Sequence, residues 1–119
     1  MGRASAQVRL SSERVERTET TLQVAVDVTN GSAATAHAIS TNPLRLSWRK
    51  QGDFPDNLTG WTSRIDIEQD IPPGGTQIIT ISLDPATYPP GSTLEISFVI
   101  EGWFWGHDIG VAPLSITLP

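Results

Sequence analysis

The residues best suited to chemistry lie in one short stretch, residues 101–110, which reads EGWFWGHDIG. Glu101 comes first, three aromatic residues follow at 103–105, and His107 and Asp108 come next. Two carboxylates can cleave a glycosidic bond when they lie about 5 Å or about 7–9 Å apart. The sequence spacing of Glu101 and Asp108 does not determine how far apart their carboxyl groups lie. The chain also has no nucleophile-elbow or phosphate-loop motif. We therefore expect a protein that is not an enzyme.

Metal binding is also not expected. The chain has no cysteine and only two histidines, and the second of them, His37, is far from His107 in the sequence. A zinc site needs three or four such ligands at defined spacing. Asp53, Asp56 and Asn57 offer oxygen atoms of the kind that calcium accepts, but they lack the longer series of ligands of a calcium loop. No metal and no cofactor is predicted.

The aromatic residues suit binding better than catalysis. A strand that buries its even-numbered positions up to residue 100, if it continued, would turn Phe104 inward and leave Trp103 and Trp105 on the outer face. Two tryptophans in that arrangement lie about 6–7 Å apart, which suits stacking on a sugar or on a partner's aromatic ring. A bulge at Gly102 would reverse this phase and bury both tryptophans at one end of the core.

The elements that position this stretch are strands. Apolar and polar residues alternate in six runs, at 21–30, 43–50, 64–69, 76–83, 93–102 and 112–119. Clusters of glycine and proline separate most of the runs, and no helical period is sustained. A further strand is expected around Val8 and Leu10. This pattern predicts an all-β fold, an antiparallel two-sheet immunoglobulin-like sandwich of about seven strands with Trp48 between the sheets.

Length and charge restrict the organisation and the partners. The 119 residues suit a single domain, which we place at 7–119 after a disordered or vector-derived leader at 1–6. The net charge of −5 disfavours nucleic acid as a partner, and no apolar run is long enough for membrane insertion. No signal peptide is recognisable, so the chain is expected to be cytoplasmic or a domain of a larger bacterial protein. Arg45, Arg49 and Lys50 are expected on the solvent side of their strand.

The segment VIEGWFWGHDIGVAPLSITL at 99–118 resembles the closing segment of an immunoglobulin-like accessory domain found on bacterial glycosyltransferases and other surface-polysaccharide proteins. The residues that carry this resemblance are Glu101, Gly102, Trp105, Gly110, Val111, Pro113 and Leu114. Looser agreement covers most of the chain. One departure is Gly106, which stands where the family commonly has an aromatic residue. The resemblance implies a non-catalytic accessory domain and does not identify a ligand.

Two functions follow as hypotheses. In the first, the domain binds carbohydrate: Trp103 and Trp105 provide the stacking surface, and Glu101, His107 and Asp108 bind hydroxyl groups. In the second, the domain is a protein-interaction or spacer module, in which the aromatic residues pack in the core, against a neighbouring domain or against a second copy of the chain.

Overall fold

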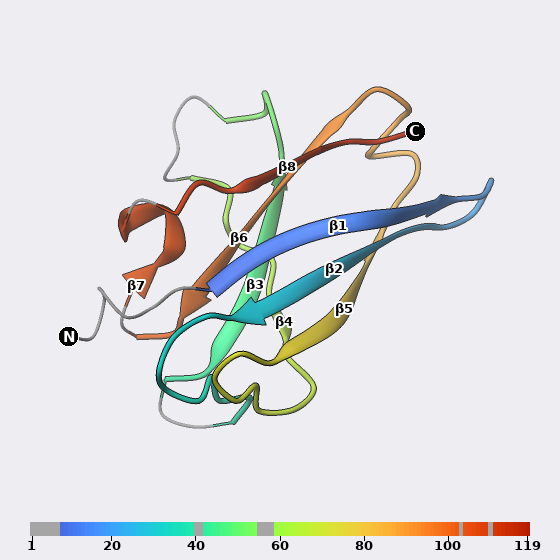
Figure 1. Ribbon diagram of the computed structural model, residues 1–119. Coiled ribbons are helices and arrows are strands. Elements are labelled where there is room, and N and C mark those ends of the chain that lie inside the picture. Colours follow the sequence, from blue (N-terminus) through green and yellow to red (C-terminus); the bar gives the residue numbers. More distant parts are fainter. Residues whose placement is uncertain (1–7, 40–41, 55–58, 103, 110) are drawn as a thin grey trace.

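The protein is an all-β sandwich. The computed structural model describes residues 8–39, 42–54, 59–102, 104–109 and 111–119 (Figure 1). Within these residues the elements are β1 Val8–Arg17, β2 Leu22–Asn30, β3 Leu44–Lys50, β4 Ile65–Asp66, β5 Thr76–Leu83, β6 Thr93–Ile100, β7 Phe104–Trp105, a short 3-10 helix Gly106–Ile109 and β8 Leu114–Thr117. No helix in this described part has the length and apolar character needed to cross a bilayer.

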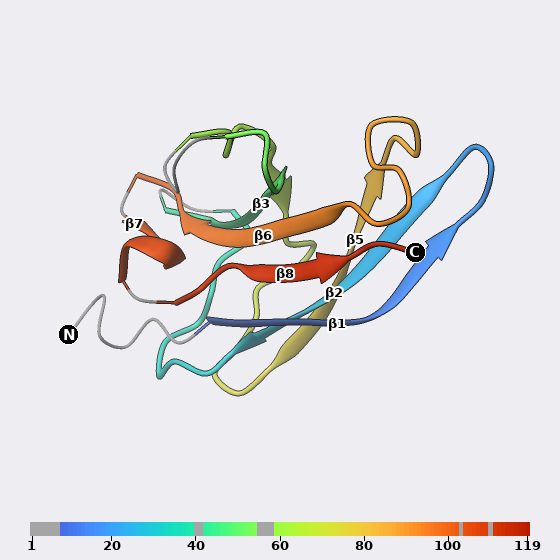
Figure 2. The same ribbon diagram turned by 90° about the horizontal axis from the view of Figure 1, so that it is seen from above.

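The strands form two antiparallel sheets that face each other, as Figure 2 shows from above. One sheet has the order β1-β2-β5, and the other has the order β4-β3-β6, with β7 and β8 both pairing with β6. The chain changes sheet between β2 and β3, between β4 and β5, and between β5 and β6. This confirms the predicted immunoglobulin-like sandwich.

The alternation seen in the sequence explains the core. Most inward-facing residues of β2, β3, β5 and β6 are apolar, and eleven of these are at most 2% exposed. They are Leu22, Val24, Val26, Val28, Leu44, Leu46, Ile79, Ile81, Leu94, Ile96 and Phe98. Trp48, which was expected between the sheets, packs against this core but is only half-buried.

The first strand is longer than expected because it contains a β-bulge. Between Ser11 and Arg14 two residues of β1 oppose a single residue of β2. The side chains that pack on the core are Val8 and Leu10 before the bulge and Val15 after it. The bulge therefore moves the inward positions from even to odd numbers, which hides the strand from a simple alternation test.

The stretch expected to continue β6 turns back instead. The sixth strand ends at Ile100, and Glu101 and Gly102 form a turn in which Gly102 has a φ of 75°. The chain then returns as β7, with Phe104 opposite Ile100 and Trp105 opposite Val99. Directly opposed residues of an antiparallel pair share a face, so Trp105 lies with Val99 on the outer face. The predicted run to residue 102 was two residues too long, and neither a continuous strand nor a bulge describes this turn.

Candidate functional site

The candidate site lies on the outer face of the sheet that contains β3 and β6. At the middle of this face Ser47 of β3 is directly opposite Ser97 of β6. Both serines point away from the hydrophobic core, yet both are buried. Two small side chains side by side leave room above the sheet, and other parts of the chain fill this room.

Trp61 and His107 fill the space above the serine pair. Trp61 comes from the connection between β3 and β4, and the residue is only 5% exposed. His107 comes from the 3-10 helix after β7, and its Nδ1 lies 2.9 Å from the Ser97 hydroxyl. The two rings stack with their centroids 5.1 Å apart and an angle of 23° between their planes. The outer face of this sheet is thus covered by aromatic packing.

Arg49 lies beside Trp61 and is buried with an acidic partner. Its Nε is 3.0 Å from Glu95 Oε1, and the two side chains are 6% and 14% exposed. Its guanidinium donates to the Thr59 carbonyl and lies 4.6 Å from the centre of the Trp61 ring. The prediction that Arg49 faces solvent was therefore wrong. Its position on the outer side of the strand was right, but Phe54, Thr59 and Trp61 lie against it.

Trp105 forms the more accessible side of this packing. Its ring is half-buried, with centroids 6.3 Å from Trp61 and 5.2 Å from His107. The Arg64 guanidinium lies 4.6 Å from the centre of the Trp105 ring and forms an ion pair with Glu101 at 2.6 Å. Arg64 also donates to the Trp61 carbonyl, which fixes its position.

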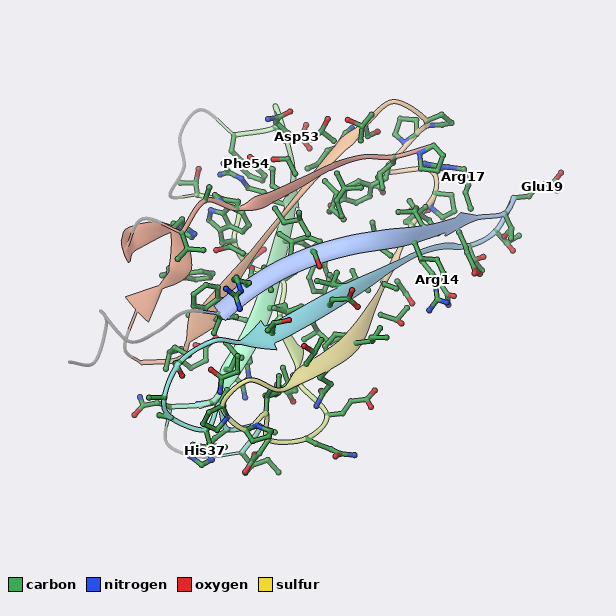
Figure 3. The ribbon with its side chains drawn as sticks, viewed as in Figure 1. Arg14, Arg17, Glu19, His37, Asp53 and Phe54 are labelled. Atoms are coloured by element: carbon green, nitrogen blue, oxygen red, sulfur yellow. The ribbon has the colours of Figure 1, made fainter. Side chains whose placement is uncertain are left out.

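We call the whole assembly the aromatic–arginine cluster, and its members are Phe54, Arg49, Trp61, His107, Trp105 and Arg64. Phe54 joins it at one end, with its ring centre 5.7 Å from the Arg49 guanidinium (Figure 3). Of the predicted site residues, the structure brings together Trp105, His107 and, through Arg64, Glu101. Trp103 and the side chain of Asp108 lie outside the described residues.

Sequence reasoning missed the members that come from 49–64. Trp61 lies at 59–63, where neither the sequence nor the structure has a strand, so no alternation indicated where it points. Arg64 is the first residue of the predicted run at 64–69, and alternation gave its side of the strand but not its contacts. The one available signal was the serine at the same outward phase in β3 and in β6, next to Arg49 and Glu95. A polar strand face with small residues at its centre leaves space in which large aromatic rings can pack.

His37 belongs to a separate contact at the other end of the domain from Phe54 (Figure 3). Its Nδ1 is 3.3 Å from Asp70 Oδ2, and the other oxygen of Asp70 accepts from the Ala38 backbone N–H at 2.8 Å. The hydrogen bond from Ala38 is the main cause that lowers the pKa of Asp70 below its ordinary value; desolvation opposes it, and the contact with His37 lowers the pKa further. No group of three or more histidine, cysteine or acidic residues that could hold a metal occurs within the part of the chain that the structure describes.

Comparison with known proteins leaves the family open. Neither the models of known protein families nor the sequences of curated proteins match the chain.

Proposed function

We propose that the chain is a non-catalytic accessory domain that binds a glycan at the outer edge of the aromatic–arginine cluster. This edge consists of Trp105, Arg64 and Glu101, and we call it the Trp105 rim. The observation that carries the proposal is the half-buried Trp105 ring beside the Arg64–Glu101 ion pair, whose side chains are both partly exposed. Sugars present apolar faces and hydroxyl groups together, so they are recognised by an aromatic ring next to charged hydrogen-bonding groups.

The inner rings of the cluster support the rim but do not themselves offer a surface. Trp61 is buried and contacts both Arg49 and His107, so no ligand can stack on it. Arg64 is held by Glu101, by the carbonyls of Trp61 and Ser63, and by the Ser47 hydroxyl. Groups that are already fixed lose little conformational entropy when they bind a ligand. The net charge of −5 favours neutral over strongly acidic glycans.

Isothermal titration calorimetry with neutral bacterial polysaccharide fragments tests this proposal. We expect saturable binding by the wild type, and at least about a tenfold loss of affinity in Trp105→Ala and in Glu101→Gln. Glu101→Gln changes little in size, so it tests the rim without opening a hole in it. Arg14→Ala, an exposed arginine on the other sheet, is the control and should bind as the wild type does. Equal binding by all four proteins would contradict the proposal.

A second candidate is recognition of a polypeptide, and one observation favours it. The Arg64 guanidinium already lies over the Trp105 ring, on surface that a stacked sugar would need. Tryptophan and arginine are the residues that most often dominate the energy of protein interfaces. If no glycan binds but Trp105 becomes less accessible to acrylamide when a neighbouring domain of the parent protein is added, the polypeptide hypothesis replaces the first.

A further inference from the structure

A different surface, the free edge of β5, carries an inference that is independent of the Trp105 rim. In the described part of the chain β5 pairs only with β2, and Figure 1 shows it at one side of its sheet, with β1 at the other. Its sequence, TQIITISL, has no charged residue, no proline and no glycine. Charged side chains and prolines usually prevent a sheet edge from pairing with other chains, and β5 lacks both. The start of the strand is partly protected, because the Gln77 side chain bonds to the backbone of Glu68 and Gln69.

The hydrogen-bonding pattern shows which backbone groups face the open edge. The Asn30 N–H donates to the Gly75 carbonyl in the same register that pairs β2 with β5. In an antiparallel ladder bonded and non-bonded pairs alternate, so Gln77, Ile79 and Ile81 bond to β2. The N–H and C=O groups of Ile78, Thr80 and Ser82 therefore point away from β2. Ile78 is also 55% exposed, so this edge of the sheet carries an uncovered apolar side chain.

We propose that the free edge of β5 pairs with β5 of a second copy of this chain, antiparallel about a two-fold axis. An axis at Thr80 places Thr80 opposite its own copy and Ile78 opposite Ser82 of the partner. In this register the outward N–H and C=O groups of Ile78, Thr80 and Ser82 all form hydrogen bonds with the partner. The contacts of the Gln77 side chain remain intact. Because the strand carries no charge, no like charges face each other within it, and the result is a continuous six-stranded sheet.

A second copy fits this edge better than an unrelated peptide because the edge is complementary to itself. Each Ile78 gains cover from the partner's strand, and all the new bonds are between main-chain groups. The contact is one strand wide, so it buries less area than a standard stable interface and the dimer is weak. Two copies with a net charge of −5 repel each other, so added salt should tighten the association.

Sedimentation velocity over a wide concentration series tests the proposal on the whole chain. We expect reversible dimerisation of the wild type and at least about a tenfold weaker association in Thr80→Lys, which sets two ammonium groups opposite each other. Gln23→Lys adds the same charge to the same face on the central strand and should dimerise as the wild type does. Thr80→Pro removes only an N–H that points outward, which an edge strand tolerates, and it should also prevent the dimer. Thermal unfolding confirms that each variant folds.

Amide hydrogen exchange provides a second measurement that locates the contact. Raising the concentration should slow exchange at Ile78, Thr80 and Ser82, while Gln77, Ile79 and Ile81 are already protected by β2. A wild type that stays monomeric at every soluble concentration would overturn the proposal. A dimer that persists in both Thr80 variants would assign self-association to another surface, and would also overturn it. Neither result depends on glycan binding at the Trp105 rim.

Discussion

At the scale of single residues, small and large side chains occupy separate positions on the outer face of the β3–β6 pair. The opposed serines Ser47 and Ser97 make a low floor, and the larger Arg49 and Glu95 stand next to it on the same two strands. Arginine suits this place because its flat guanidinium can lie against the Trp61 ring while it bonds to a carboxylate. Burial of a charge costs free energy unless a partner compensates it, so Arg49 depends on Glu95.

This dependence gives the first prediction from the residue scale. Glu95→Gln leaves Arg49 without its ionised partner, and we expect the free energy of unfolding to fall by roughly 3 kcal/mol. Urea unfolding followed by circular dichroism measures this change. Asp66→Asn, which breaks the exposed Arg45–Asp66 pair, is the matched control and should cost less than about 1 kcal/mol. Similar losses in the two variants would show that Arg49 is not effectively buried.

Gly106 occupies a position where the packing leaves no room for a side chain. A Cβ atom built on Gly106 would lie 2.4 Å from the Phe98 ring, which is much closer than real carbon atoms approach. An aromatic residue therefore cannot stand at this position in the arrangement seen here. The absence of a side chain lets the 3-10 helix lie against the edge of the core and presents His107 to Ser97.

At the scale of elements, the two connections that pass along one end of the sandwich are joined to each other. Ala36 and Ile71 form a two-way backbone bridge, and the Asn30 side chain donates to the Ile71 carbonyl. Asp70 adds its bond from the Ala38 N–H and its contact with His37. These short contacts hold together segments that have little regular structure.

The lowered pKa of Asp70 leads to a prediction about acid. A carboxyl group with a lower pKa in the folded state stabilises the protein above its unfolded pKa of about 3.8. That stabilisation is lost as the pH falls through the lower, folded pKa. We expect Asp70→Asn to be less stable than the wild type near neutral pH and the difference to shrink in strong acid. Unfolding measured in urea across the acid range checks this, and a difference that stays constant with pH would contradict it.

Elements whose two faces differ in polarity could be predicted from the sequence, and the others could not. The strands β2, β3, β5, β6 and β8 all follow from alternation, because one face of each packs on the core. Alternation reports which face a residue occupies, not what covers that face. Trp61 and the burial of Arg49 were therefore missed, since a loop without periodicity supplies the cover. The turn at 101–102 was missed because Glu101 continues the alternation of β6 for one more residue.

At the scale of the whole molecule, the two outer faces of the sandwich are unlike. The sheet that contains β3 and β6 carries the aromatic–arginine cluster over its outer face. The sheet β1-β2-β5 has polar side chains and Ile78 on its outer face, and it ends at the free edge of β5. The two proposed binding surfaces therefore lie on different sheets. A domain built in this way can hold a ligand on one sheet while it joins a second copy through the other.

The bulge in β1 also matters for how the length of this chain can change. At the bulge, β1 has one residue more than the opposing part of β2. Removal of Ser12 would therefore give a regular strand in which Val8, Leu10 and Val15 still face the core. We expect this deletion to cost only the Ser12 hydrogen bond to the Ala25 carbonyl, about 1 kcal/mol. Deletion of Ala25 from β2 would reverse the phase of a central strand and prevent folding. Thermal unfolding of the two deletion variants distinguishes them. The first strand can thus gain or lose a residue during evolution without disturbing the rest of the fold.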